Sequence, residues 1–303
     1  MYDVVILGGG PAGLAAAVYF ARQKLKFALL TKDIGGYALL SDDVENYLGF
    51  HLLNGMELVK KFQEHLKDYE GQFELKEGEP ASKVEKMKGG FLVTTEKGAY
   101  ETRTILIATG TTHRKLNVPG EDLLYGKGVT YCANCDAPLF KDKKVFVVGG
   151  GNSAMDAALF LEKYTTGIVI VTVNANLGGD ALIKEKILSS KNISVLTGTK
   201  TAQIVGSTRV TGISLVGPDG KERLESAEGV FIEIGLQPIT DFIQIVEKDK
   251  AGQIVIDKHN QTSVEGIYGA GDVTDVTEKQ IAVAVGEGSK AALQIIAWLQ
   301  KNA

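Results

Sequence analysis

Two glycine-rich turns constrain the fold of this chain more than any other feature of its sequence. The first, GGGPAG at 8–13, follows the apolar run YDVVIL and precedes the helical pattern LAAAVYFARQ. The second lies inside VFVVGGGNSAMDAALFLEKY, residues 145–164, and repeats the order of strand, turn and helix. Such turns follow a parallel strand and bring a helix N-terminus close to a pyrophosphate. We therefore predict an α/β protein with two Rossmann-like dinucleotide-binding domains.

The length and composition of the chain agree with two ordinary globular domains. It has 303 residues, of which 44% are hydrophobic, enough for two sizeable cores. The net charge of −4 leaves no excess of cations to neutralise phosphates, which argues weakly against a nucleic-acid partner. The sequence enters a strand directly after Met1 and has no apolar run long enough to span a bilayer. We expect a cytoplasmic protein that binds neither nucleic acid nor membranes.

The order of the patterns predicts that the second domain is inserted into the first. The amphipathic helix pattern at 279–299 has no core of its own, so it is expected to return to the first domain. We predict a discontinuous cofactor domain made of residues 1–113 and 242–303, with residues 114–241 forming the inserted domain. Two short crossings would join the domains and allow them to rotate against each other.

The first glycine turn has the spacing that dinucleotide binding requires. Gly8, Gly10 and Gly13 follow the G-x-G-x-x-G order in a strand–turn–helix context. The alternative is a structural turn whose glycines serve only the close packing of strand and helix. The acid that usually binds a ribose hydroxyl at the end of the next strand is absent, because Thr31 stands there. The ribose contact is therefore expected from elsewhere.

The two cysteines of the chain form a C-x-x-C pair within CANCD, residues 132–136. Thiols at this spacing can close a small disulfide ring, and a thiolate attacks disulfides. Half a zinc site or two buried cysteines are the alternatives, but zinc generally needs four ligands and the 4 histidines are scattered. We predict a redox pair, Cys132 and Cys135, and no metal site. Asp136 could move protons for the dithiol; the alternative is a surface turn residue.

Together these motifs resemble the low-molecular-weight thioredoxin reductases over essentially the whole chain. The motifs occur in the order of that family, which is the first glycine turn, Val44-Glu45-Asn46-Tyr47, Ala108-Thr109-Gly110, the CxxCD, the second glycine turn, Gly269-Ala270-Gly271-Asp272 and the helix at Gln280. The resemblance implies that the first domain binds FAD and that the inserted domain is NAD(P)H-like and carries the CxxC. It also implies thioredoxin as electron acceptor and a homodimer.

The resemblance further assigns roles to single residues. It implies that Cys135 lies next to the flavin, that Cys132 exchanges with thioredoxin, and that Asp136 is the acid/base. Asp272 is expected on the ribityl chain, and residues 279–281 near the pyrimidine edge of the flavin. The cofactor-binding residues expected on this basis are Gly8, Gly10, Pro11, Ala12, Gly13, Thr31, Gly36, Tyr37, Asn46, Thr109, Gly110, Gly271, Asp272, Lys279, Gln280 and Ile281.

One departure from the family pattern places an aromatic residue near the expected flavin. The family has Gly-Gly-Gln after the second strand, whereas this chain has Gly35-Gly36-Tyr37. The Tyr37 ring could stack on the isoalloxazine or simply fill space.

A second departure concerns the electron donor. The family's His-Arg-Arg-x-x-x-Arg, whose arginines hold the 2′-phosphate of NADPH, falls on VNANLGGD at 173–180, and no arginine occurs between Arg114 and Arg209. Losing two charge-assisted hydrogen bonds costs about 3–6 kcal/mol, roughly a hundred- to ten-thousand-fold in affinity. Nor does the strand end at 171–174 offer an acid for the ribose of NADH. The glycines of the second turn remain, either for a nucleotide or for packing.

These observations favour one function and leave others open. Some relatives that lack the arginine motif resemble this chain and take electrons from reduced ferredoxin, so we predict a ferredoxin-dependent flavin thioredoxin reductase. The alternative is an NAD(P)H-dependent reductase of thioredoxin or of a peroxiredoxin system, with an atypical nucleotide site. A dithiol oxidase is disfavoured by Asp136, and a non-catalytic flavin redox sensor is disfavoured by the intact pair and acid.

Overall fold

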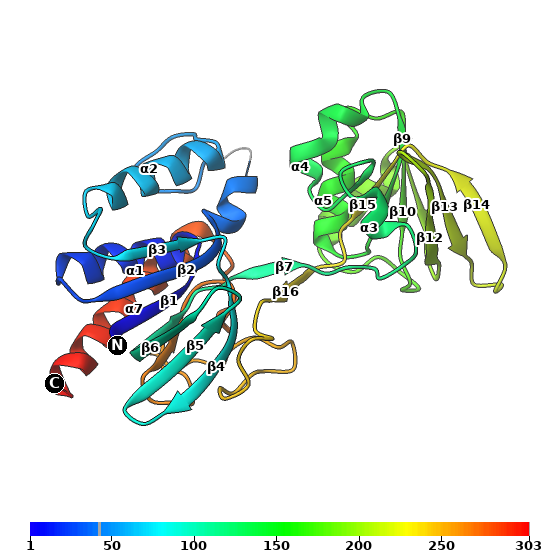
Figure 1. Cartoon of the computed structure of the whole chain (residues 1–303). Helices are drawn as coiled ribbons and strands as arrows, with labels where there is room; N and C mark the ends of the chain where they lie inside the picture. Colours follow the sequence, from blue (N-terminus) through cyan, green and yellow to red (C-terminus); the bar gives the residue numbers. More distant parts are fainter. Residues whose placement is uncertain (42–43, 303) are drawn as a thin grey trace. The chain divides into compact units, whose positions relative to one another are not determined.

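The computed structural model describes residues 1–41 and 44–302, and these form two compact units (Figure 1). Unit 1 comprises Met1–Thr112 and Gln237–Ala303, and unit 2 comprises His113–Leu236. The chain crosses between them in β7 (Thr111–His113) and β16 (Leu236–Pro238), which pair as a two-stranded ladder. The second crossing lies a few residues before the expected position, because the pairing of β16 with β7 starts at Leu236.

Unit 1 is built on a seven-stranded sheet with the order β3-β2-β1-β6-β5-β4, and β17 also pairs with β6. The pairs among β3, β2, β1, β6 and β17 are parallel, whereas β4, β5 and β6 pair antiparallel. The strands are β1 (Tyr2–Gly9), β2 (Phe27–Ile34), β3 (Glu74–Glu77), β4 (Ala81–Met87), β5 (Gly90–Thr95), β6 (Ala99–Ile107) and β17 (Ile267–Gly269).

The central strand β1 is buried on both faces, which explains its unbroken apolar sequence. Val4 and Ile6 lie in one core and Val5 and Leu7 in the other, and none of the four exposes more than 1% of its surface. β-Branched residues on a doubly covered parallel strand are the expected pattern, because neither face meets water. The strand therefore fixes where the following glycine turn lies.

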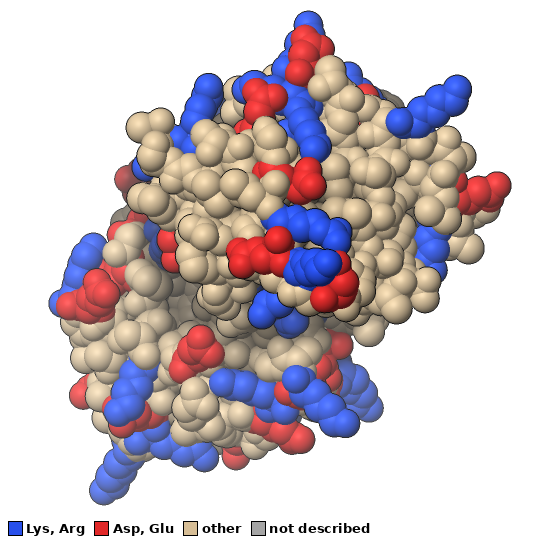
Figure 2. All heavy atoms as spheres, turned by 90° about the vertical axis from the view of Figure 1, so that its right-hand side faces the viewer, with Lys and Arg blue, Asp and Glu red and all other residues tan. Residues whose placement is uncertain are grey.

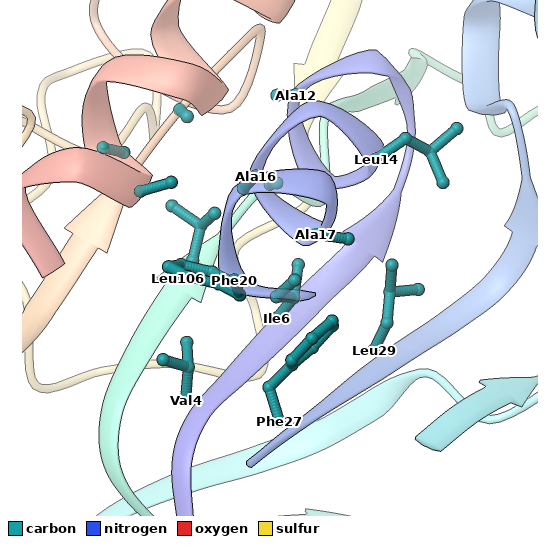
Figure 3. Packing of buried hydrophobic residues seen from close by; sticks show 14 of the residues in the cluster. Val4, Ile6, Ala12, Leu14, Ala16, Ala17, Phe20, Phe27, Leu29 and Leu106 are labelled. Carbon is teal, nitrogen blue, oxygen red and sulfur yellow. The ribbon is translucent and has the colours of Figure 1, made fainter. Parts of the chain in front are cut away.

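Helices cover one face of this sheet. They are α1 (Pro11–Arg22), α2 (Gly55–Lys67) and α7 (Ile281–Lys301), and the short 3₁₀ helix η1 (Gly36–Leu40) precedes α2. Figure 3 shows Ala16 and Phe20 of α1 close to Val4, Ile6 and Leu106 of the sheet. α2 begins with a capping box, in which the Asn54 side chain accepts the Glu57 N–H at 2.8 Å.

α7 packs so closely against α1 that one of its glycines cannot carry a side chain. A Cβ on Gly288 would lie 2.0 Å from the carbonyl oxygen of Ala12. A Cβ on Gly286, two residues earlier on the same helix, would meet no atom within 4 Å. The C-terminal helix, expected to return to the first domain, thus packs on the helix that follows the first glycine turn.

Unit 2 contains a five-stranded parallel sheet with the order β11-β10-β9-β15-β8 and a three-stranded antiparallel sheet, β12-β13-β14. The strands are β8 (Val129–Thr130), β9 (Lys144–Val148), β10 (Gly167–Val171), β11 (Ile193–Leu196), β12 (Lys200–Gly206), β13 (Val210–Val216), β14 (Glu222–Ser226) and β15 (Gly229–Ile232). The helices are α3 (Glu121–Leu124), α4 (Ala133–Asp136), the 3₁₀ helix η2 (Ala137–Phe140), α5 (Asn152–Leu161) and α6 (Ala181–Ser189).

The predicted fold class is confirmed. Each unit has a sheet with parallel strands in which one strand leads through a glycine turn into a helix, β1 into α1 and β9 into α5, although the sheet of unit 1 also contains antiparallel pairs. Within the described chain, no helix is both long and apolar enough to cross a membrane.

The contact between α1 and α7 gives a first test with a matched control. Gly288→Ala should lower the free energy of unfolding by about 1–3 kcal/mol, because its methyl group overlaps the Ala12 carbonyl. Gly286→Ala should raise it by up to about 1 kcal/mol, because alanine favours helix and its methyl group meets only open space. Denaturant unfolding followed by flavin fluorescence measures both. Equal effects of the two substitutions would contradict the proposed packing.

Candidate functional site

Unit 1 has a cavity of about 680 Å³ where β1 and β6 end. Ligands of open α/β sheets bind in this position, beyond the carboxyl ends of the strands. All the residues expected to bind the cofactor line this cavity except Gly13, namely Gly8, Gly10, Pro11, Ala12, Thr31, Gly36, Tyr37, Asn46, Thr109, Gly110, Gly271, Asp272, Lys279, Gln280 and Ile281. Segments from both ends of the sequence thus meet at one site.

Each of the three glycines of the first turn is needed for a different physical reason. A Cβ on Gly8, whose φ is +112°, would lie 2.2 Å from the carbonyl oxygen of Ala108, and a Cβ on Gly13 would lie 2.0 Å from that of Gly8. These two glycines are required by the fold itself. Gly10 differs, because a Cβ there would meet nothing within 4 Å. Its backbone is extended at the N-terminus of α1, so the missing side chain leaves room for a ligand phosphate.

Thr31 stabilises the first glycine turn through its side chain. β2 continues past it to Ile34, and Thr31 is buried. Its hydroxyl accepts the Gly9 N–H at 2.8 Å and donates to the carbonyl oxygen of Asp33 at 2.6 Å. The exposed residues at this strand end are Lys32 and Asp33, which also line the cavity. Neither residue was predicted from the sequence to bind the cofactor, although a carboxylate such as that of Asp33 is the group that a ribose diol prefers.

The C-terminal wall of the cavity carries a half-buried acid, Asp272, and a half-buried base, Lys279. Burial raises the pKa of Asp272, and Lys279 partly offsets this. Burial lowers the pKa of Lys279, while Asp272 and Glu287 act in the opposite direction. The Lys279 Nζ donates to the carbonyl oxygen of Thr274 at 2.6 Å, and the Gly271 N–H donates to Glu287 Oε2 at 3.1 Å. Both hydrogen bonds fix the backbone of this wall.

Hydrogen bonds also join the remaining motifs around the cavity. The Asn46 amide donates to Gln280 Oε1 at 3.0 Å, which ties the segment at 44–47 to the start of α7. The Thr109 hydroxyl donates to the carbonyl oxygen of Ile239 at 2.7 Å. Tyr37 lies on η1 and lines the cavity.

In unit 2, Cys132 and Cys135 form a disulfide with an S–S distance of 2.07 Å. Cys132 caps α4, and its sulfur accepts the Cys135 N–H at 3.2 Å. The Cys132 N–H donates to the hydroxyl of Thr130 at 3.1 Å. Asp136 ends α4, is half-buried, and donates its N–H to the carbonyl oxygen of Cys132 at 3.3 Å. Among the described residues, no group of three or more His, Cys, Asp or Glu could hold a metal ion.

A carboxyl group that the sequence reasoning missed lies beside this pair. Glu233 directly follows β15, and its side chain accepts the backbone N–H of Ala133, the residue after Cys132. Burial raises the pKa of Glu233 to about 7, although the Ala133 N–H acts to lower it. Glu233 lies far from the two cysteines in the sequence. Its position as an acid directly after the apolar strand GVFI is the one sequence feature that could have drawn attention to it.

The second glycine turn repeats the geometry of the first. A Cβ on Gly149, whose φ is +147°, would lie 2.1 Å from the carbonyl oxygen of Glu233. A Cβ on Gly151 would meet nothing within 4 Å, as at Gly10. Ala154 stands where the first turn has Gly13, and it is fully buried. The open space beside the helix N-terminus is therefore present in both units.

The loop between β10 and α6, residues 172–180, differs from a nucleotide-binding loop. It contains no arginine and no lysine. The Gly178 N–H donates to the carbonyl oxygen of Gly150 at 2.7 Å, which joins the loop to the glycine turn. Its one acid, Asp180, caps α6, with Oδ1 accepting the N–H groups of Leu182 and Ile183. The loop thus offers no cation for a 2′-phosphate, and its acid already serves the helix.

Comparison with known proteins identifies the family. The model of the family described as pyridine nucleotide-disulphide oxidoreductase matches residues 2–288. The chain is 38% identical to an alkyl hydroperoxide reductase component of Staphylococcus aureus over 304 residues, 99% of this chain and 60% of that protein. It therefore spans less than two thirds of the length of these curated relatives.

Solved structures match the whole chain. A thioredoxin reductase from T. acidophilum is 39% identical, with a TM-score of 0.81 over 100% of this chain and 99% of that one. The Lactococcus lactis thioredoxin reductase in its FR conformation is 32% identical, with a TM-score of 0.84 over 99% and 100%. A ferredoxin-flavin thioredoxin reductase from Clostridium acetobutylicum is 29% identical, with a TM-score of 0.55 over 99% and 98%.

The geometry of unit 1 fits the cofactor of these proteins. The open Gly10 at the start of α1 and the surrounding cavity suit the phosphates of FAD, and FAD is the cofactor of this chain. The disulfide in unit 2 supplies the second redox group. The chain belongs to the pyridine nucleotide-disulphide oxidoreductase family and is a flavin disulfide oxidoreductase of the thioredoxin reductase type.

Proposed function

We propose that the chain reduces thioredoxin through Cys132 and Cys135, with electrons that reduced ferredoxin delivers to its FAD. The observation that carries this proposal is the β10–α6 loop, which keeps the backbone of a nucleotide site without the side chains that select a nucleotide. The proposal concerns the donor and the acceptor, since the type of enzyme follows from the family.

The loop argues against both pyridine nucleotides. NADPH has a 2′-phosphate that needs cations, and the next lysines in the sequence, Lys184 and Lys186, lie further along on α6. NADH has a ribose diol that needs an acceptor at the end of β10, where Val173 is 68% exposed and Asp180 caps a helix. Without a group that distinguishes them, the two nucleotides should bind about equally weakly.

The comparisons support ferredoxin as the donor. The Clostridium acetobutylicum relative is a ferredoxin-flavin thioredoxin reductase, and it aligns with this chain from end to end. Ferredoxin needs no nucleotide cleft, because it has only to bring an iron–sulfur cluster near a flavin edge. When bound, FAD supplies the conversion between single electrons and an electron pair.

Different residues of this chain would bind FAD and carry out the thiol exchange. Pro11, Ala12 and the open Gly10 would hold the pyrophosphate of FAD at the start of α1, while Asp272 and residues 279–281 would hold the opposite wall. The Cys132–Cys135 disulfide accepts two electrons and two protons and becomes a dithiol. Cys132 then exchanges with the disulfide of thioredoxin, and Asp136 handles a proton in that step.

The proposal also covers the oligomeric state and the location of the protein. We propose a cytoplasmic homodimer, and the exposed apolar side chains of Leu48, Leu52 and Met56 on one short segment of unit 1 are compatible with a covered surface. On the face drawn in Figure 2, Lys and Arg side chains lie dispersed among Asp and Glu. Ferredoxins are usually acidic, so docking on such lysines should weaken as salt rises.

A second candidate function rests on Gly151. Its open space would accept a pyrophosphate, and the 38% identity to the alkyl hydroperoxide reductase component suggests a peroxiredoxin system. In that case the chain would be an NAD(P)H-dependent reductase whose nucleotide is held mainly through its phosphates. The donor experiment separates the two functions.

Turnover with thioredoxin at matched donor concentrations tests the donor. Reduced ferredoxin should support saturable turnover that slows as ionic strength rises, because charged surfaces meet in the encounter. NADPH and NADH should both be slow and differ little from each other. Disulfide reduction is followed by the insulin precipitation that reduced thioredoxin causes. Fast and saturable oxidation of NADPH at micromolar concentration would overturn the proposal and favour the second candidate.

The two open glycines provide a matched pair of variants. Gly10→Val should leave the fold intact but weaken FAD binding roughly tenfold or more, because the side chain fills the space beside the helix N-terminus. Gly151→Val should leave FAD content and ferredoxin-supported turnover unchanged. Flavin absorbance after dialysis and the turnover assay measure the two effects. Loss of ferredoxin-supported turnover in a correctly folded Gly151→Val protein would show that the second turn binds something essential.

A further inference from the structure

We propose that the hydrogen bond from the Tyr131 hydroxyl to the buried Glu121 carboxylate holds Cys132 in position after the disulfide has been reduced, and so favours re-formation of the disulfide. Glu121 and Tyr131 are positioning residues in this role, because they act through the backbone that leads into Cys132. The inference rests on the proposed function in one respect, which is that the cysteine pair cycles between disulfide and dithiol. It does not depend on the identity of the donor or the acceptor.

The fold of unit 2 fixes the place of the Glu121 carboxylate. Glu121 is the first residue of α3 and is 2% exposed. In the turn before it, Gly120 has a φ of +89°, and a Cβ there would lie 1.9 Å from the carbonyl oxygen of Ile204 on β12. The Ile204 N–H donates to the carbonyl oxygen of Pro119 at 2.9 Å. The start of α3 is therefore held against β12.

This carboxylate binds two separate segments of the chain. Oε1 accepts the Leu116 N–H at 2.9 Å, and Oε2 accepts the N–H groups of Asn117 at 2.6 Å and Val118 at 3.4 Å. These three residues belong to the segment by which the chain enters unit 2 after β7. Oε1 also accepts the Tyr131 hydroxyl at 2.7 Å. Such donors compensate the buried charge for its lost hydration, so the carboxylate is a firm anchor for both segments.

The Tyr131 side chain is held at its face as well as at its hydroxyl. Tyr131 follows β8 and directly precedes Cys132. Its ring stacks on the His113 ring, with centroids 5.3 Å apart and planes at 17°, and lies 5.6 Å from the Tyr125 ring. Burial and the hydrogen bond to Glu121 raise the pKa of Tyr131, so the phenol stays protonated and remains a donor. The hydrogen bond thus fixes the end of a ring that already packs on its neighbours.

The backbone on the N-terminal side of the Cys132 sulfur is held without help from the S–S bond. Cys132 is extended, with φ −134° and ψ 100°, and its N–H donates to the hydroxyl of Thr130 at 3.1 Å. Thr130 is buried and belongs to β8. The residue between them, Tyr131, is the one that Glu121 binds. Neither contact uses the disulfide, so both can keep Cys132 in place when the disulfide opens.

This arrangement changes the balance between disulfide and dithiol. Two electrons and two protons convert the disulfide into two thiols, and oxidation of the thiols reverses the step. Ring closure needs the two sulfurs to meet, and it is favoured when their positions are already restricted in the dithiol. A held Cys132 has less conformational freedom to lose on closure. Loss of the Tyr131–Glu121 hydrogen bond should therefore favour the dithiol.

A redox equilibrium of the holoprotein tests the proposal with a substitution that changes no charge. Tyr131→Phe removes the hydroxyl and keeps the ring. The protein is equilibrated anaerobically with mixtures of reduced and oxidised glutathione and quenched in acid, and its thiols are tagged with a maleimide and counted by mass spectrometry. The ratio of disulfide to dithiol should fall roughly three- to tenfold in Tyr131→Phe, the range expected for one hydrogen bond. Tyr125→Phe, in the neighbouring ring that is 61% exposed, should match wild type.

A double-variant comparison separates this role from support of the entry segment. Glu121→Ala removes the acceptor for all the donors, so it disturbs residues 116–118 as well as Tyr131. If the two residues act through one hydrogen bond, adding Tyr131→Phe to Glu121→Ala should change the ratio no further. An additive change would overturn the proposal.

Should Glu121→Ala fail to fold, Tyr131→Phe decides alone. A ratio equal to that of wild type in Tyr131→Phe, or an equal fall in Tyr125→Phe, would contradict the proposed role of the hydrogen bond. Failure of ferredoxin-supported or thioredoxin turnover in the wild-type protein would instead count against the proposed function alone, because the glutathione equilibrium uses neither protein.

Discussion

The structure depends on one backbone arrangement that it uses twice, the close approach of a glycine turn to the end of the neighbouring parallel strand. In unit 1, Gly8 is separated from the Ala108 carbonyl by less than the width of a side chain, and in unit 2, Gly149 is equally close to the carbonyl of Glu233. Both glycines have positive φ, which other residues adopt only with strain. Each contact sets the direction in which the next helix leaves the sheet, and Gly10 and Gly151 leave open space at the start of that helix.

The two units differ in what surrounds this shared arrangement. In unit 1, chain segments from both ends of the sequence enclose a cavity with a half-buried acid, Asp272, and a half-buried base, Lys279, on one wall. In unit 2, the loop between β10 and α6 is hydrogen-bonded to the second glycine turn through the Gly178 N–H. Glu233, the residue after β15, is an acid whose pKa the backbone N–H of Ala133 in α4 acts to lower. The same backbone thus serves a cofactor in one unit and a dithiol in the other. This difference is the physical basis for proposing that electrons enter without a pyridine nucleotide.

Local patterns in the sequence predicted the features that local physics determines. The apolar run before Gly8, the turn itself and the helix after it follow from residues that are neighbours in sequence, as does the Cys132–Cys135 spacing. The resemblance to a known family then supplied the residues of the C-terminal wall. The position of the second crossing was less accurate, because the pairing of β16 with β7 depends on residues more than a hundred positions apart.

The features that the sequence did not reveal all depend on contacts between distant segments. Asp33 lies at the cavity because β2 continues beyond Thr31, whose hydroxyl serves the turn. Asp180 caps the N-terminus of α6, a role that cannot be predicted from the presence of a single acid in a loop. Glu233 reaches the N–H of Ala133 only because β15 ends beside α4. Polar groups acquire such roles from the hydrogen bonds that the fold brings within reach, not from their place in a motif.

Equilibrium binding of pyridine nucleotides to the oxidised holoprotein tests the central claim most directly. Isothermal titration calorimetry with NADPH and with NADH, at low salt and with Gly151→Val as the reference, measures whether the second unit binds a nucleotide at all. The account predicts no saturable heat at micromolar concentration for either nucleotide, and no difference between the variant and the wild type. A micromolar Kd for NADPH or NADH that is lost in Gly151→Val would contradict it.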